Sequence, residues 1–209
     1  FGGAIRVPGI NYVNFLIPGI IVQTAAFGAI GTAIGLSDEL SKGVIDRFRS
    51  MPISRSAVLI GRLASDMLRN LVTVLILLGV GYGIGFRPTT GVGALVAAVC
   101  IAVLFSLAIS CISAFIGLAV KDPESVQMFG FIWIFPLTFA SNVFAPTASM
   151  PGWLQAWVKV NPVSIVSEAL RNLTLGGPTV THVWESFVWM AAIVAVFLTL
   201  AVRAYRRVT

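Results

Sequence analysis

The sequence predicts an all-α membrane protein, and its composition and apolar patterning lead to this fold class. Of its 209 residues, 57% are hydrophobic and only 11% are charged, and the mean hydropathy is +0.95. A soluble domain carries about 25% charged residues, so this chain would expose an apolar surface in water. Its apolar segments reach the roughly 20 residues that a helix needs to cross a bilayer. Helices are favoured in lipid because they pair their own backbone groups.

Five segments are predicted to span the membrane, and together they form one domain over residues 1–209. They are residues 14–36, 65–86, 92–120, 125–144 and 183–202. The fourth is the weakest, because Pro136 lies in mid-span and predicts a kink there. Gln23 in the first span is costly in lipid, which predicts that it faces protein or a cavity.

The basic residues predict the orientation of the spans. If the segment 37–56 is cytoplasmic, ten of the 14 Lys and Arg residues lie on that side: Lys42, Arg47, Arg49, Arg55, Arg62, Arg69, Lys121, Arg203, Arg206 and Arg207. The other four are Arg6, Arg87, Lys159 and Arg171. The positive-inside rule favours this arrangement. It places Phe1 outside, so we expect a sixth span before Phe1.

The charged segment 37–56 separates the first two spans and is predicted to form an amphipathic helix. One apolar stripe at helical spacing is formed by Leu40, Val44, Phe48 and Met51. Ser37 is expected to cap the start of this helix and Pro52 to end it. Such a helix suits a groove on a soluble partner. The alternative is an interfacial helix whose arginines bind anionic lipid.

Three charged residues, Arg62, Asp66 and Arg69, lie where the second span enters the membrane. Charges at this depth are costly unless they pair or reach the interface, and Arg62 and Asp66 have the spacing to pair along one helix. A helix end fixed at its depth and a substrate or proton site are both compatible with this pattern. On the first span, Gly31 and Gly35 form a small-xxx-small motif, which indicates close packing within the chain or between two chains.

Polar and aromatic residues in the first and fourth spans are candidates for a substrate path. They are Gln23, Thr24, Phe27, Ser141 and Asn142. Hydrogen bonding to neighbouring helices is the alternative role for their polar groups.

The outer loop 145–181 is predicted to contain two short interfacial or re-entrant helices. Tryptophans concentrate at the boundary between lipid and water, and Asn161-Pro162 breaks the helical pattern. The residues that define this region are Trp153, Trp157, Asn161, Pro162, Glu168 and Arg171. Glu168 and Arg171 are three residues apart and have the spacing of an ion pair.

Signals for an enzyme are absent from the sequence. His182 is the only histidine, which excludes a metal site built from several histidines. The chain lacks the G-x-x-x-x-G-K-[ST] motif of P-loop ATPases. Its basic residues lie between apolar segments rather than in one patch, so a nucleic-acid partner is not expected.

Five segments carry a resemblance to a known family: GVIDRFRSMPISRSAVLIGRL, Phe1–Ile5, Ile84-Gly85-Phe86-Arg87-Pro88, Met150-Pro151-Gly152-Trp153-Leu154-Gln155 and Asn161-Pro162-Val163. They resemble the membrane subunit of ABC-2-type exporters, and more closely the daunorubicin/doxorubicin-resistance permease subfamily of actinobacteria. The resemblance spans the whole chain. It implies a type V exporter with six helices per subunit in the bacterial inner membrane, and it implies that 37–56 is the coupling helix.

The resemblance also implies partners and site residues. Two permease subunits, identical or different, would assemble in membrane lipid with two ATP-binding subunits, which carry ATP and Mg. The residues of the coupling helix that match the family pattern are Glu39, Gly43, Ile45, Asp46, Arg47, Phe48, Arg49 and Pro52. The chain itself is then expected to bind no cofactor or metal and to catalyse no reaction.

The function that follows is export of a hydrophobic drug-like or lipid substrate, driven by ATP hydrolysis on the partner subunit. Drugs, antibiotics, glycolipids and polyketide lipids are all compatible with an apolar path. One alternative is a membrane scaffold without transport. Another is an ion-coupled secondary transporter, although such proteins usually place ionisable groups near mid-membrane.

Overall fold

The structure, a computed structural model, describes residues 10–42, 55–120 and 122–208, and in these ranges all regular elements are helices. Five long helices form the body: α1 (Tyr12–Ser41), α3 (Arg55–Gly83), α4 (Val92–Ala119), α5 (Pro123–Phe139) and α8 (Thr179–Val208). Three short elements follow α5: η1 (Thr147–Ser149), α6 (Gly152–Val160) and α7 (Pro162–Leu175). The all-α prediction is confirmed.

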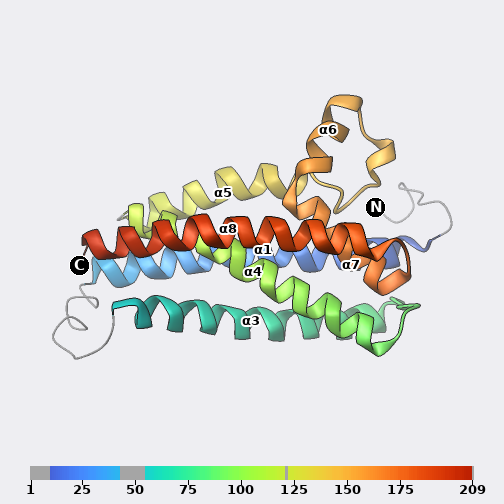
Figure 1. The fold of residues 1–209 in the computed structure, drawn as a ribbon, viewed down its shortest axis with the longest axis horizontal. Coiled ribbons are helices and arrows are strands. Elements are labelled where there is room, and N and C mark those ends of the chain that lie inside the picture. The colour runs from blue at the N-terminus through green and yellow to red at the C-terminus, as the bar shows by residue number, and fades with distance from the viewer. Residues whose placement is uncertain (1–9, 43–54, 121, 209) are drawn as a thin grey trace.

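The long helices run side by side, and their ends separate into two groups (Figure 1). One end of the bundle holds the C-terminal ends of α1, α4 and α8 and the N-terminal ends of α3 and α5. The opposite end carries α6 and α7. The two helix ends that flank residues 43–54, the start of α5 and the end of α8 therefore share one end, as the distribution of basic residues predicts.

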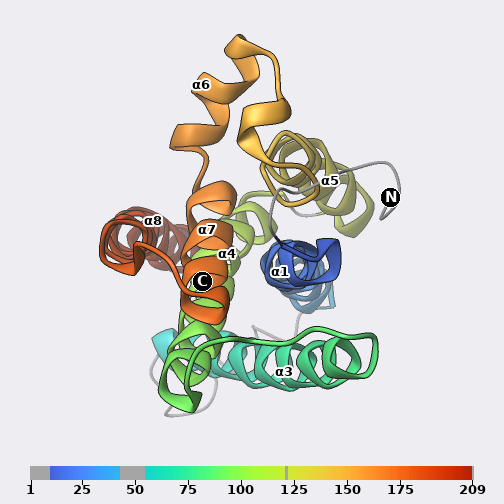
Figure 2. The ribbon, with the colours of Figure 1, turned by 90° about the vertical axis from the view of Figure 1, so that its right-hand side faces the viewer.

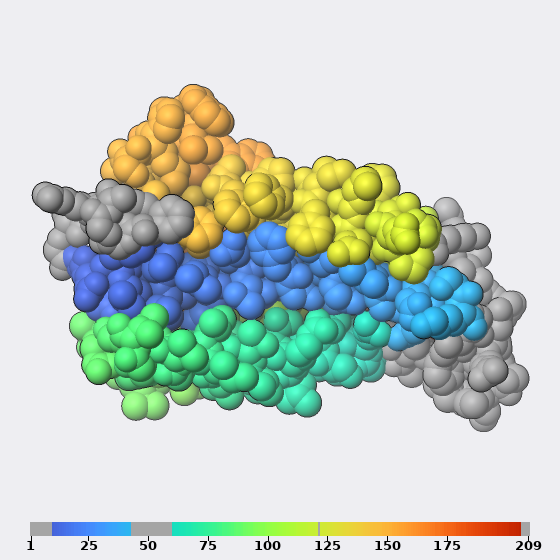
Figure 3. All heavy atoms as spheres, turned by 180° about the vertical axis from the view of Figure 1, so that it is seen from behind, coloured from blue at the N-terminus to red at the C-terminus, as the bar shows by residue number. Residues whose placement is uncertain are grey.

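Helix α4 is the centre of the packing. It contacts α1, α8, α3, α7 and α5, and its Phe105, Ile109 and Leu118 are fully buried. Gly117 allows α1 to approach closely, because a Cβ at this position would overlap the backbone of Ala33. The outward faces of α3, α5 and α8 expose large apolar side chains, which suits a surface surrounded by lipid. On another side of the molecule, α1 lies between α5 and α3 (Figure 3).

Four helices in the described part of the chain are long and apolar enough to cross a membrane. They are α1, residues 60–83 of α3, α4, and residues 179–205 of α8. Each contains or overlaps a predicted span. Helix α5 has 17 residues, which is about 25 Å of helix. It ends at Phe139 rather than at 144, and Asn161 Nδ2 satisfies the carbonyl oxygens of Leu137 and Ala140 at this end, at 2.8 and 3.2 Å.

The start of the predicted coupling helix belongs to α1. Ser37, Asp38 and Glu39 continue α1 as far as Ser41, so the expectation that Ser37 caps a new helix is wrong. The segment from Leu36 to Ser41 contains no glycine or proline to end the helix. Ser37 is buried, and its Oγ donates to the carbonyl oxygen of Val120 at 3.2 Å.

The outer region contains the two short helices that the sequence predicts, separated at Asn161. Asn161 caps α7, since its Oδ1 accepts from the Val163 amide at 2.9 Å, and Pro162 occupies the first turn. Helix α6 stands apart from the bundle (Figure 2), and its Trp153 is 75% exposed. Trp157 is exposed as well. In contrast, α7 packs against α1, α4 and α8. The depth of both helices in the bilayer stays a prediction.

Candidate functional site

The candidate site lies at the end of the bundle where the charged segment leaves α1 and returns to α3. Of the residues predicted to dock an ATP-binding subunit, only Glu39 is among those that the structure describes. The others lie outside the described residues: Gly43, Ile45, Asp46, Arg47, Phe48, Arg49 and Pro52. The described part of the site is therefore the pair of helices that carries this segment.

One face of α1 is formed by glycines at helical spacing and receives polar side chains from α3. A Cβ added to Gly28 would lie 3.2 Å from Asn70 Oδ1, and one at Gly31 would lie 3.4 Å from Arg69 Nη1. A Cβ at Gly35 would overlap the Arg62 guanidinium. The small-xxx-small motif thus serves packing within the chain, where it makes room for side chains of α3.

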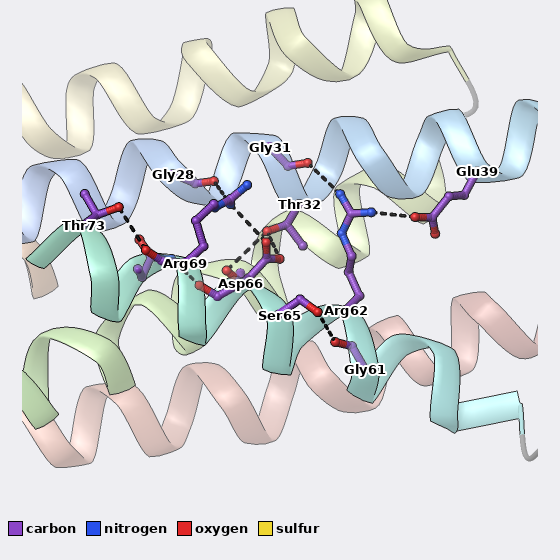
Figure 4. Close-up of polar contacts among 12 residues, drawn as sticks. Gly28, Gly31, Thr32, Glu39, Gly61, Arg62, Ser65, Asp66, Arg69 and Thr73 are labelled. Carbon is purple, nitrogen blue, oxygen red and sulfur yellow. Dashed lines mark hydrogen bonds and ion pairs between the residues drawn. The ribbon is translucent and has the colours of Figure 1, made fainter.

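Between these two helices the charged and polar groups form what we call the α1–α3 clamp: Thr32, Glu39, Arg62, Asp66, Arg69 and Asn70 (Figure 4). Its outer part joins Arg62 Nη1 to Glu39 Oε1 at 2.5 Å, and Arg62 Nη2 donates to the carbonyl oxygen of Gly31 at 3.3 Å. Both side chains of this ion pair are about three-quarters shielded from solvent. The C-terminal part of α1 and the N-terminal part of α3 are therefore tied together directly.

The inner part of the clamp surrounds Asp66, which is only 4% exposed. Thr32 Oγ1 on α1 donates to Asp66 Oδ2 at 2.5 Å, and Arg69 Nη2 lies 3.0 Å from Asp66 Oδ1. Arg69 Nη2 also donates to the carbonyl oxygen of Gly28 at 3.0 Å. A carboxylate buried at this depth is costly unless it is paired and hydrogen-bonded, and here both conditions are met.

The pairing differs from the predicted one. Asp66 pairs with Arg69 rather than with Arg62, because Arg62 reaches toward the end of α1 and binds Glu39. Asp66 turns instead toward Thr32 and the interior. Which arginine pairs with Asp66 depends on the position of α1. The spacing of residues along α3 gives no information about that position.

Helix α4 also contacts the clamp. Ser110 Oγ lies 3.4 Å from Thr32 Oγ1, and Ser110 is buried. Asn70 is buried as well, and its Nδ2 donates to the Asp66 carbonyl oxygen at 3.0 Å. Thr32 and Asn70 are the two clamp residues that the sequence does not single out. A signal was available for Asn70, which follows Asp66 by four residues on the same helix face.

A second buried charge lies at the opposite end of the bundle. Arg171 on α7 is 4% exposed, and its Nε donates to the Phe15 carbonyl oxygen at 2.9 Å. Its Nη2 donates to the carbonyl oxygens of Asn142 and Val143 at 2.7 and 3.1 Å, and Nη1 lies 3.5 Å from Glu168 Oε1. Burial lowers the pKa of Arg171 to about 10, opposed by Glu168, so the side chain stays charged at neutral pH. The predicted Glu168–Arg171 pair is present.

The residues proposed for a substrate path are not brought together. Gln23, Thr24 and Phe27 are half-buried on α1, and Phe27 packs against Phe131 of α5 at 6.2 Å between ring centroids. Ser141 and Asn142 are buried beyond the end of α5. Ser141 Oγ donates to the Thr138 carbonyl oxygen, and Asn142 Nδ2 donates to Glu168 Oε1 at 2.7 Å. Their place in a path stays a prediction.

The described residues contain no group of three or more His, Cys, Asp or Glu side chains placed to hold a metal ion. The clamp consists of matched charges and hydrogen bonds between helices. Its contacts tie α1 to α3.

Comparison with known proteins agrees with this architecture. Residues 7–203 match the family described as ABC-2 family transporter protein. The chain is 36% identical to the daunorubicin resistance ABC transporter permease protein DrrB1 of Streptomyces coeruleorubidus, over 99% of this chain and 73% of that protein. It is 30% identical to the probable doxorubicin resistance ABC transporter permease protein DrrC of Mycobacterium tuberculosis, over 92% of this chain and 69% of that protein.

A more distant relative is the probable multidrug ABC transporter permease YbhR of Escherichia coli, which is 24% identical over 96% of this chain and 54% of its own length. The match of the family over most of the chain and the apolar helices of the structure lead to the same conclusion. This chain belongs to the ABC-2 family of transporter proteins, as a multi-pass permease of the bacterial inner membrane whose family works with an ATP-binding partner subunit.

Proposed function

We propose that this chain is the permease subunit of an exporter that moves a hydrophobic drug-like or lipid substrate out of the cell. ATP and Mg act on two copies of a separate ATP-binding subunit, and a second permease subunit, identical or different, completes the transporter. The names of the two relatives above refer to resistance to daunorubicin and doxorubicin, which supports a drug-like substrate. This chain then supplies the path and the mechanical link.

The segment 37–56 docks the ATP-binding subunit, and the α1–α3 clamp passes the movement on. The observation that carries this proposal is the ion pair between Glu39 and Arg62, which joins the start of the segment, still part of α1, to α3. Without this ion pair, a displacement of the segment by the ATP-binding subunit would bend α1 and α3 independently and would not move them together. ATP binding shifts the permease between two states only through contacts that differ between those states.

The buried carboxylate of Asp66 does not favour an ion-coupled transporter. It lies six residues after the start of the apolar part of α3, about 9 Å along the helix, and thus near one end of the span. Arg69 matches its charge at 3.0 Å. Groups that carry coupling ions lie near mid-membrane.

The test exchanges the two charges of the outer pair. The complex with its ATP-binding subunit is reconstituted in inside-out vesicles, and ATP-dependent uptake of daunorubicin and ATP hydrolysis are measured together. Glu39→Arg and Arg62→Glu are each expected to lower the amount transported per ATP by about fivefold or more, since each leaves two like charges at a partly buried contact. The double variant restores an opposite pair and is expected to recover most of the coupling.

Arg203→Glu is the matched control, because Arg203 is exposed on α8 and lies outside both the segment 37–56 and the clamp. Its transport ratio is expected to stay within twofold of the wild type. Equal ratios in all variants would contradict a role of the clamp in coupling. Absence of ATP-dependent uptake across a panel of drugs and lipids in the wild-type complex would contradict the exporter proposal itself.

A further inference from the structure

Arg171 connects three separate parts of the chain at the end of the bundle that carries α6 and α7 (Figure 1). From α7, its Nε donates to the Phe15 carbonyl oxygen of α1 at 2.9 Å. Its Nη2 donates to the Asn142 and Val143 carbonyl oxygens, in the segment after α5, at 2.7 and 3.1 Å. We call Arg171 and these three residues the outer joint. Because all three acceptors belong to the backbone, no side-chain rotation of a partner can release them.

The three parts of the outer joint meet at close range. A Cβ at Gly19 of α1 would lie 2.8 Å from the Val143 carbonyl oxygen and 3.0 Å from Arg171 Nη2. The Arg171 Cζ lies 3.7 Å from the centroid of the Phe15 ring, and Arg171 is only 4% exposed. At this burial, separation of the parts removes several charge-assisted hydrogen bonds together, which favours two discrete arrangements over a gradual opening.

The charge of Arg171 has an alternative partner on its own helix. Arg171 Nη1 lies 3.5 Å from Glu168 Oε1 and has no hydrogen-bond partner among the described residues. The same oxygen of Glu168 accepts from Asn142 Nδ2 at 2.7 Å. If the segment after α5 moved away, Asn142 would leave Glu168. Arg171 would then exchange the lost carbonyl oxygens for a closer ion pair one turn away on α7.

Helix α1 connects the outer joint to the α1–α3 clamp. It is one continuous helix through both, and Phe15 lies about 36 Å along it from Glu39. Pro18 has no N–H to donate to the Asn14 carbonyl oxygen, so α1 bends most easily in the turn that contains Phe15. A displacement of α1 at the clamp therefore reaches the outer joint through a single helix.

We propose that Arg171 is a positioning residue that keeps this end of the permease closed, and that opening exchanges its bonds to Asn142 and Val143 for the ion pair with Glu168. The contacts above are those of the closed state. This inference rests on the proposed export function, because a substrate that leaves the cell needs an opening at the end opposite the clamp. Arg171 acts on the backbone of its partners and needs no contact with the substrate.

The test measures how fast a buried thiol next to the outer joint reacts. Ser164 is 2% exposed, and its Oγ accepts from the Asn142 amide at 3.3 Å, so the segment after α5 covers it. Ser164→Cys is made in a chain with Cys100 and Cys111 replaced by Ser, and the complex with its ATP-binding subunit is placed in nanodiscs.

A polar maleimide is added to this complex without nucleotide or after trapping with ATP and vanadate. Mass spectrometry of the α7 peptide gives the rate of labelling. Trapping is expected to raise this rate about tenfold or more, because the segment after α5 then leaves α7.

Two substitutions are expected to move the rate in opposite directions. Asn142→Leu keeps the backbone carbonyl but frees Glu168 for Arg171, so it is expected to raise the rate without nucleotide about fivefold. Glu168→Gln still accepts from Asn142 but removes the ion pair of the open state, so the rate after trapping is expected to fall about fivefold. General loosening of the fold, or loss of a negative charge beside the thiol, would instead raise the rate in Glu168→Gln.

Glu185→Gln is the matched control, because it removes a charge at the same end, where Glu185 pairs with His182 at 3.4 Å outside the outer joint. Its rates are expected to stay within about twofold of those of the parent. A rate that does not respond to trapping in a complex that exports daunorubicin overturns the inference and leaves export standing. Unchanged rates in Asn142→Leu, or an unchanged or larger response in Glu168→Gln, overturn it as well. The expected rates in a complex that exports nothing would refute the export proposal alone.

Discussion

At the scale of single residues, Gly35 shows how one hydrogen atom in place of a side chain shapes the clamp. The Arg62 guanidinium occupies the space where a Cβ of residue 35 would lie. This contact places Arg62 Nη1 next to Glu39, one turn further along α1. The glycine is therefore required by its neighbour on α3 rather than by its own backbone, which is helical.

Gly35→Ala is expected to displace Arg62 and to weaken the Glu39–Arg62 pair, which lowers the free energy of unfolding by about 1–3 kcal/mol. Thermal unfolding of the purified protein in detergent measures this loss as a lower midpoint. Gly79→Ala is the matched control, because nothing lies within 4 Å of a Cβ at that position. It is expected to be neutral or slightly stabilising, since alanine favours the helix. Similar losses in both variants would contradict the specific contact.

At the scale of elements, Asn161 joins the end of α5 to the start of α7. Its Oδ1 caps α7 at the Val163 amide, and its Nδ2 donates to the Leu137 and Ala140 carbonyl oxygens of α5. The residue is buried, so these groups have no water to replace a lost partner. One side chain thus ends one helix and begins another.

Asn161→Ala removes both contacts and is expected to destabilise the protein by roughly 2–4 kcal/mol, the sum of a lost cap and unpaired carbonyls. Asn161→Asp keeps the cap but cannot donate to α5, so α7 is expected to stay protected while the end of α5 opens. Hydrogen exchange measured by mass spectrometry distinguishes the two variants. Equal protection of α5 in wild type and Asn161→Asp would contradict the bridging role.

At the scale of the whole molecule, the bundle has two chemically different ends. One end carries the clamp and the ends of α1 and α3 that flank residues 43–54, and the other carries α6 and α7. The positive-inside rule places the first end in the cytoplasm. The proposed coupling requires this orientation, because ATP-binding subunits are cytoplasmic.

Cysteine labelling tests the orientation. In a variant with Cys100 and Cys111 replaced by Ser, Ser149→Cys is expected to react with a membrane-impermeant maleimide on intact cells. Lys42→Cys is expected to react only in inside-out vesicles. Both positions are exposed in the structure, so access is decided by the side of the membrane. The reverse pattern would place the charged segment outside and contradict the proposed role of the chain.

The sequence by itself determined the helical class, the positions of the long helices, the two short outer helices and the shared end of the basic residues. These features depend on the length of each apolar segment, on proline and asparagine at helix starts, and on the distribution of charged residues. All three can be read directly from the local sequence. The Glu168–Arg171 pair followed for the same reason, since its partners share one helix.

Only the tertiary structure decided which groups meet across helices. Arg62 binds Glu39 because α1 extends beyond its apolar part, and Asp66 faces Thr32 because glycines bring α1 and α3 close together. Arg171 is buried because α7 packs against α1, α4 and α8, whereas α6 does not. Which residues meet across two helices depends on how each helix is rotated about its axis and how deep it lies in the membrane. The apolar pattern of a helix surrounded by lipid and protein specifies neither quantity.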